Sequence, residues 1–206
     1  MSERVLPRSF YLPDPREVAP LLLNKVLRFQ EGPLGVRGVP VVSGRIVEVE
    51  AYCGAMDPGS HAFRGRTPRT ATMFGPPGHL YVYFTYGMHW CANVVCGPDG
   101  DAGAVLLRAV APIDGLDVMW SRRPKARRER DLGSGPARLA QAFGLARADD
   151  GADLVAGPLQ VVDDGMPPPA RPGVSTRIGL ASGRGEESPW RYYVPGDPNI
   201  SRPPRT

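Results

Sequence analysis

Two glutamates and a tyrosine alternate along a stretch rich in β-branched residues. Segment 41–52 ends in Glu48-Val49-Glu50-Ala51-Tyr52 and is typical of a β-strand. Alternate side chains of a strand share a face, so Glu48, Glu50 and Tyr52 should point one way, with neighbouring carboxylates about 6.6 Å apart. Such carboxylates could act as general acid and base, or hold a divalent cation. A solvated polar face, the commoner explanation, would show the same pattern. The residues expected to face the core are Val47, Val49 and Ala51.

A basic loop follows this strand. His61 stands eleven residues after Glu50, and the next residues include Arg64, Arg66 and Arg69 among glycine and proline. A guanidinium group pairs with phosphate through two parallel hydrogen bonds. The loop is therefore a candidate contact for a nucleic-acid backbone.

Tyrosines crowd the next expected strand, 79–85, and its turn. Tyr81 and Tyr83 share a face, and Tyr86 precedes Gly87 at the expected tip of a hairpin. Aromatic side chains are more often part of a core than groups that stack on bases. An exposed aromatic residue at a tip beside a basic loop is nevertheless typical of a wedge that enters a duplex.

Two polar residues interrupt the apolar strands expected over 90–96 and 104–111. Asn93 would be buried, and a buried amide needs a hydrogen-bond partner. Arg108 would also be buried, and a buried guanidinium requires a carboxylate or a site to serve. Glu50 is the expected partner of Arg108.

The helix and strand signals together favour an α+β fold. Asp14 and Pro15 would open a helix whose apolar residues recur at helical spacing as far as Val26. Further helices are expected over 115–123 and 134–143, and further strands over 159–162, 177–180 and 190–194. We expect one domain over 1–206, with a mainly antiparallel, curved β-sheet core flanked by short helices. Its ordered core should span about 9–200, and the tail 201–206 should fray.

The composition is that of a basic globular chain. The net charge is +4, the pI is near 9.2, and 23 of the 25 basic residues are arginine. Such a domain is predisposed to bind polyanions. The sequence shows neither the roughly 18-residue apolar run of a membrane span nor the apolar core of a signal peptide. Three scattered cysteines, Cys53, Cys91 and Cys96, suit a reducing compartment and offer too few ligands for zinc.

Long motifs in a fixed order run through most of the chain, roughly 12–201. They are Val49-Glu50-Ala51-Tyr52, Ser60-His61-Ala62, Arg64-Gly65-x-Thr67, Met73-Phe74, Leu80-Tyr81-Val82-Tyr83-x-x-Tyr86-Gly87-Met88, Val105-Leu106-Leu107-Arg108-Ala109, Ser134-Gly135-Pro136 with Leu139, and Pro189-Trp190-Arg191-Tyr192-Tyr193-Val194. In these motifs the chain resembles the alkyladenine (3-methyladenine, N-methylpurine) DNA glycosylase family. It departs from the family at Thr70, where asparagine is frequent, so the resemblance does not imply a loop-ordering contact of that amide here.

The resemblance implies roles for the candidate catalytic residues. Glu50 would be the general base for the hydrolytic water, and Arg108 would help to position that water. Tyr86 would be the wedge inserted into the duplex.

The resemblance also implies a pocket for a flipped base. The rings of Tyr52 and Tyr83 would stack on the base, and His61 would hydrogen-bond to one of its edges. Asn93, at the rim, would select against normal guanine by clashing with its exocyclic amino group.

The activity implied by the resemblance is hydrolysis of the N-glycosidic bond of alkylated or deaminated purines, which initiates base excision repair. This substrate class includes 3-methyladenine, 7-methylguanine, hypoxanthine and ethenoadenine. The enzyme would be monofunctional because no lysine lies among the candidate residues, and it would need neither a metal nor another cofactor. Its partner would be double-stranded DNA containing damaged purines. It would act as a monomer, without a membrane, in a bacterial cytoplasm in association with the nucleoid.

Two other classes of function remain open on the residues alone. A metal-dependent nuclease could use Glu48, Glu50 and Asp57 around Mg²⁺, and chelators would then abolish its activity. A non-catalytic nucleic-acid-binding module would explain the arginines and tyrosines, and Glu50 would then be dispensable.

Overall fold

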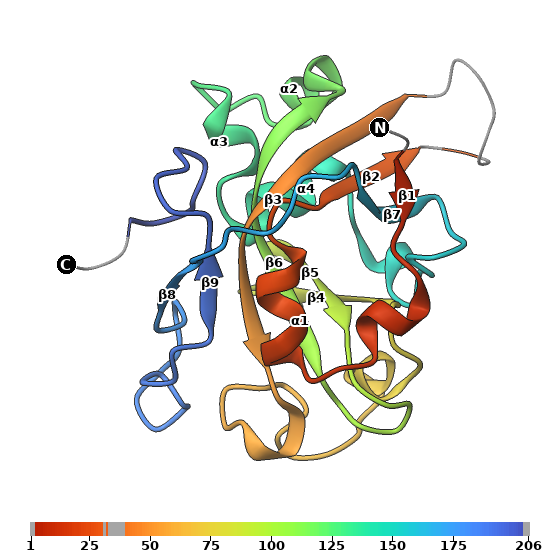
Figure 1. Cartoon of the computed structure of the whole chain (residues 1–206), viewed down its shortest axis with the longest axis vertical. Helices are drawn as coiled ribbons and strands as arrows, with labels where there is room; N and C mark the ends of the chain where they lie inside the picture. The colour runs from red at the N-terminus through yellow and green to blue at the C-terminus, as the bar shows by residue number, and fades with distance from the viewer. Residues whose placement is uncertain (1–2, 31, 33–39, 204–206) are drawn as a thin grey trace.

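An antiparallel β-sheet carries both candidate catalytic residues and most of the candidate pocket residues (Figure 1). The computed structural model describes residues 3–30, 32 and 40–203. The strands are β1 (Arg4–Val5), β2 (Val26–Gln30), β3 (Val41–Tyr52), β4 (Leu80–Thr85), β5 (His89–Val95), β6 (Ala104–Asp114), β7 (Leu159–Asp163), β8 (Gly173–Ser175) and β9 (Arg191–Tyr193). Their order is β1-β7-β2-β3-β6-β5-β4, and β9 pairs with β3 and β8. All pairings between these strands are antiparallel and the sheet is curled, so the expected single-domain α+β fold is confirmed.

The long strand β3 lies at the centre of this arrangement. One edge of β3 pairs with β6, while the other edge pairs first with β2 and then with β9. Three register shifts interrupt the β3–β6 ladder, and the two on either side of Glu48 leave Val47 of β3 and Arg108 of β6 without a partner in this ladder. Bulges of this kind redirect side chains. Val47, Val49 and Ala51 are all completely buried, as expected, and Val49 and Ala51 belong to the main apolar cluster.

The first helix, α1 (Pro15–Leu22), begins as expected and ends early. Asp14 is its N-cap and accepts a hydrogen bond from the backbone N–H of Arg16 at 2.8 Å. The prediction that the helix reaches Val26 is wrong. The chain turns at Asn24, whose φ is +67°, and Val26 begins β2, where it pairs with two strands. Apolar spacing is compatible with either structure here, and the pairing on both edges of β2 decides between them.

Three more helices complete the core. They are α2 (Leu116–Arg122), α3 (Arg130–Gly133) and α4 (Pro136–Phe143), and the first and last confirm the helices expected over 115–123 and 134–143. Helix α1 packs on β3 and β6, while α4 packs on β5 and β6. Leu22, Leu107 and Phe143 are completely buried in the resulting core. Burial of each such side chain contributes about 1.5–3 kcal/mol, so the core fixes the strands that carry the site.

The later strand predictions are mostly confirmed. Strands β4, β5 and β6 are successive antiparallel neighbours, as their short loops indicated, and β7 and β9 match the expected segments 159–162 and 190–194. The strand expected over 177–180 is wrong, because this segment has no regular structure. The backbone N–H of Ile178 donates to Glu50 at 2.7 Å, so it is satisfied by a side chain and not by a strand.

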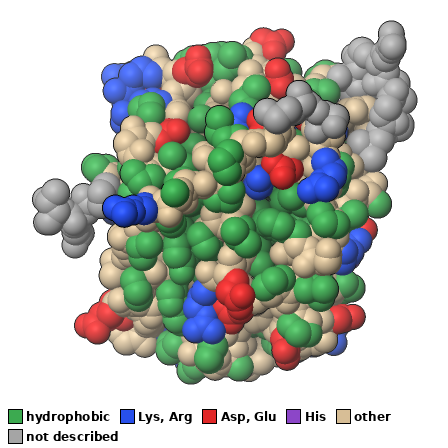
Figure 2. All heavy atoms as spheres, in the orientation of Figure 1, with side chains coloured by type: hydrophobic (Ala, Val, Ile, Leu, Met, Phe, Trp, Pro, Cys, Tyr) green, Lys and Arg blue, Asp and Glu red, His purple; other side chains and the backbone are tan. Residues whose placement is uncertain are grey.

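The surface mixes charges of both signs. On the face shown in Figure 2, acidic and basic side chains are interspersed among apolar ones, so the net charge of +4 is not gathered there into one basic surface. Among the described residues, no helix is both long and apolar enough to cross a membrane.

Candidate active site

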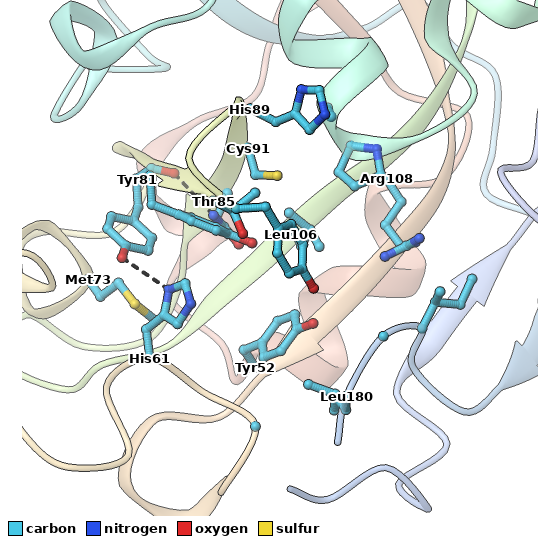
Figure 3. Close-up of a pocket in the computed structure, with 18 residues that line it drawn as sticks. Tyr52, His61, Met73, Tyr81, Thr85, His89, Cys91, Leu106, Arg108 and Leu180 are labelled. Carbon is cyan, nitrogen blue, oxygen red and sulfur yellow. Dashed lines mark hydrogen bonds between the residues drawn. The ribbon is translucent and has the colours of Figure 1, made fainter. Parts of the chain in front are cut away.

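A cavity of about 280 Å³ opens beside the end of β3 (Figure 3). Its wall combines the end of β3, the β4–β5 hairpin, β6 and the segment before β9. The lining residues used below are Tyr52, His61, Tyr81, Tyr83, Tyr86, Asn93, Leu106, Arg108 and Ile178. The cavity therefore brings together six residues expected from the sequence, from Tyr52 to Arg108, and Arg108 faces His61 and Tyr81 across it.

Glu50 lies behind this wall and is completely buried. Its carboxylate accepts hydrogen bonds from the hydroxyl of Tyr52 at 2.9 Å and from the backbone N–H of Ile178 at 2.7 Å. Nη1 of Arg108 lies 3.2 Å from the carboxylate Oε2. Three donors thus hold the carboxylate, and all three belong to residues that line the cavity. A carboxylate beside a cavity is a group that can act as a general base.

Arg108 is shared between two carboxylates. Its Nε lies 3.0 Å from Oε1 of Glu48, in addition to the contact with Glu50. The expected pairing with Glu50 is therefore confirmed, and Glu48 is a second partner that was not expected. Burial opposes the charge of the guanidinium, but the two carboxylates outweigh this effect and raise the pKa of Arg108 above its ordinary value.

The aromatic wall is built from β4 and the loop before it. His61 Nδ1 lies 3.2 Å from the hydroxyl of Tyr81, and the His61 ring stands at 87° to the Tyr83 ring with centroids 4.4 Å apart. Partial burial of the ring and the positive charge of Arg69 lower the pKa of His61 to about 4. His61 is therefore neutral near pH 7. Tyr81 was not expected among the site residues, although its alternation with Tyr83 was a signal.

A buried ion pair supports Tyr52 from behind. The guanidinium of Arg177 makes two short contacts with Asp57, of 2.6 and 2.7 Å, and lies 4.6 Å from the centre of the Tyr52 ring. Burial, followed by the negative charge of Glu50, raises the pKa of the Tyr52 hydroxyl well above its ordinary value. Tyr52 thus remains a neutral donor to Glu50. Arg177 was not predicted as a site residue because the pattern of segment 177–180 predicts a strand.

The carboxylates of the alternative metal site do not converge. Glu48 and Glu50 hold Arg108, while Asp57 is bound to Arg177. Over the described ranges, 3–30, 32 and 40–203, no cluster of three or more histidine, cysteine, aspartate or glutamate side chains could hold a metal ion. This arrangement disfavours the nuclease hypothesis.

The tip of the β4–β5 hairpin presents an aromatic side chain to solvent. Tyr86 is 81% exposed, and it has φ +51° before Gly87 at φ +66°. Asn93, opposite Tyr81 in the same hairpin, is buried and donates from Nδ2 to the Tyr81 carbonyl at 3.1 Å. The β4–β5 hairpin therefore carries both an exposed tip residue, Tyr86, and a buried pocket residue, Asn93.

The basic loop has an internal support. The side chain of Thr70 is buried, and its Oγ1 accepts a hydrogen bond from the backbone N–H of Thr67 at 2.9 Å. Threonine therefore provides an ordering contact at the position where the family often has asparagine. Arg64 and Arg66 are exposed, whereas Arg69 also lies 5.9 Å from the Tyr83 ring, at the edge of the pocket.

The fold thus forms a pocket that could hold a planar ring between aromatic side chains, next to a buried carboxylate. The chain belongs to the methylpurine-DNA glycosylase family, whose sequence model matches residues 9–198. It is a DNA N-glycosylase, a hydrolase of DNA repair.

Several bacterial relatives are similar over nearly their whole length. A protein of Burkholderia cenocepacia is 53% identical, with 96% of this chain and 91% of the relative covered. Proteins of Leifsonia xyli (50% identical, 94% and 90% covered) and Streptomyces avermitilis (47% identical, 95% and 90% covered) are also similar. All three are named "Putative 3-methyladenine DNA glycosylase".

Proposed function

We propose that the enzyme receives a damaged purine, flipped out of duplex DNA, in the cavity beside Tyr52 and hydrolyses its N-glycosidic bond with water activated by Glu50. The observation that carries this proposal is the buried Glu50 carboxylate, which is held by three donors directly behind the cavity. A base inside a duplex cannot reach such a group, so extrusion must precede the reaction.

The hydrolytic step uses the two charged residues in different ways. As the N-glycosidic bond lengthens, positive charge develops on the sugar, and a nearby carboxylate stabilises that charge. Glu50 accepts a proton from water, the water oxygen bonds to C1′ of the sugar, and the bonding electron pair leaves with the purine. Arg108 lines the cavity and contacts Glu50, so it is placed to orient this water.

The aromatic wall suits a damaged purine. The faces of Tyr52 and Tyr83 favour a cationic alkylated base over a neutral one. His61 is neutral, so it does not repel a cationic base, and with one nitrogen at the Tyr81 hydroxyl its other ring nitrogen remains for the base edge. Asn93 at the pocket wall would exclude the amino group of guanine. We include 3-methyladenine, 7-methylguanine, hypoxanthine and ethenoadenine among the substrates.

The remaining candidates would hold the duplex. Tyr86 is exposed at a hairpin tip, where it can fill the space that the flipped nucleotide vacates. Arg64, Arg66 and Arg69 would contact phosphates beside the lesion. We propose that a monomer carries out the whole reaction.

The test is to incubate the protein with duplexes that contain 3-methyladenine, hypoxanthine or ethenoadenine and to measure released base. We expect free base and an intact abasic strand, with no inhibition by EDTA. Release of no base from any of these duplexes would refute the proposal.

Borohydride trapping tests the monofunctional mechanism. The chain has two lysines: Lys25 is 2.8 Å from Asp163, and Lys125 lines a different cavity. Because glycosylases that also cut the strand usually form a Schiff base through an amine, we expect no covalent adduct with DNA. An adduct that disappears in Lys125→Ala would contradict this mechanism.

A further inference from the structure

A second carboxylate, Glu48, is completely buried beside the proposed catalytic pair. It accepts hydrogen bonds from Nε of Arg108 at 3.0 Å and from Nε of Arg191 at 2.7 Å. The backbone N–H and the hydroxyl of Ser201 also donate to it, the hydroxyl at 2.9 Å. Glu48 therefore joins β3, β6, β9 and the segment after β9, and it does not line the pocket.

The segment after β9 was expected to fray from residue 201. In the structure, Ser201 bonds to Glu48, and the carbonyl of Arg202 accepts a hydrogen bond from Arg191. A buried carboxylate and a buried guanidinium both need partners, and this segment supplies them.

Ser201 also reaches Arg108 directly. Nη2 of Arg108 donates to the Ser201 hydroxyl at 3.3 Å, while that hydroxyl donates to Glu48. Each nitrogen of the Arg108 side chain thus has a partner: Nε contacts Glu48, Nη2 contacts Ser201 and Nη1 contacts Glu50. Because a guanidinium group is planar, contacts along one edge fix the direction of the remaining edge.

We propose that Glu48 and Ser201 are positioning residues that hold Arg108 in its catalytic orientation. Without them, Arg108 could turn and bind both oxygens of Glu50, since a bidentate pair is the preferred geometry of a guanidinium and a carboxylate. Such a pair would occupy the oxygen that must accept the proton of water. Glu48 and Ser201 thus leave Arg108 a single contact with Glu50. This inference rests on the proposed function.

The test compares two serine-to-alanine variants of the full chain. Ser201→Ala removes a hydroxyl that contacts both Glu48 and Arg108. Ser175→Ala, the matched control, removes a hydroxyl that contacts Arg191 at 3.0 Å and neither of the other two residues. The readouts are the single-turnover rate of base release and the affinity for lesion DNA. The rate reports the chemical step, whereas the affinity reports binding.

We expect Ser201→Ala to slow base release about tenfold with unchanged affinity, because Glu48 and Arg108 each lose their hydrogen bond with the Ser201 hydroxyl. Ser175→Ala should stay within about twofold of wild type, and Ser201→Thr should restore most of the rate by restoring a hydroxyl. A wild-type rate for Ser201→Ala, equal losses in both alanine variants, or a loss confined to affinity would overturn the inference. If the wild-type protein itself releases no base, it is the proposed function that fails.

Discussion

Replacement of Glu50 by glutamine tests the proposed base with almost no change in shape. The carboxylate has three donors: the Tyr52 hydroxyl, the backbone N–H of Ile178 and the Arg108 guanidinium. The hydroxyl can rotate and become an acceptor, but the other two groups only donate. Because the two obligate donors approach different oxygens, the glutamine NH₂ must face one of them.

The cost to stability follows from this mismatch. Glu50→Gln leaves two buried arginines, Arg108 and Arg191, with one carboxylate, Glu48. Breaking a buried ion pair costs about 3–5 kcal/mol, and the remaining contact of Arg108 with Glu48 places this variant at the lower end of that range. Typical domains are stable by about 5–15 kcal/mol, so we expect a folded protein with a lower midpoint of denaturant unfolding.

The cost to catalysis should be larger than any effect on binding. An amide cannot take a proton from water, and general-base catalysis contributes about 10²–10⁴-fold. We therefore expect single-turnover base release to fall at least about 100-fold, with lesion binding retained. Glu17→Gln, at an exposed site in the first turn of α1, is the matched control and should leave the rate unchanged. If excision by folded Glu50→Gln stays within about threefold of wild type, Glu50 is not the base.

The other predictions concern binding and pH. Tyr86→Ala should weaken lesion binding about tenfold because a stacking side chain is lost, whereas Tyr86→Phe should bind like the wild type. Unchanged fluorescence of a flipped base analogue in Tyr86→Ala would refute the wedge role. Replacement of both Arg64 and Arg66 by alanine should reduce the slope of log affinity for DNA against log salt concentration by about 1.8, because each phosphate contact contributes about 0.9. An unchanged slope would exclude both residues as phosphate contacts. His61, whose pKa is about 4, should keep a neutral NMR signal at pH 5.5. Between pH 6.5 and 4 the His61 ring is protonated in the unfolded chain before it is protonated in the folded one, so the free energy of unfolding should decrease on acidification. His61→Gln should remove this part of the pH dependence. A charged His61 ring at pH 5.5 would contradict the lowered pKa.

Much of the site could be predicted because it is local in sequence. Glu48, Glu50 and Tyr52 alternate on one strand, and the structure confirms the expected pairing of Arg108 with Glu50. It adds two contacts that were not predicted, from Arg108 to Glu48 and from the Tyr52 hydroxyl to Glu50. The hairpin that carries Tyr86 follows from short loops and strand periodicity. These features depend on a period of two and on neighbours in the chain, which a sequence displays directly.

The supporting contacts could not be predicted in the same way. Arg177 is 120 residues from Asp57 in the sequence, and Ser201 is 153 residues from Glu48. These contacts depend on which distant segments pack against β3, and a local sequence pattern does not show that packing. A buried arginine signals that some carboxylate is near it, but the signal does not say which one.

The two register shifts on either side of Glu48 explain why Arg108 contacts Glu48 in addition to its expected partner, Glu50. Perfect alternation would make Arg108 an ordinary ladder residue, whereas in the structure it has no partner in the β3–β6 ladder, in which Glu48 pairs with Ala109 and Val49 pairs with Leu107. The guanidinium spans the two carboxylates of β3. Arg191 from the next strand then supplies the second positive charge, so two buried carboxylates meet two buried guanidinium groups. Burial of four charges is tolerable only when they are paired and hydrogen-bonded, so β9 and the segment after it are as necessary to this centre as β3 itself.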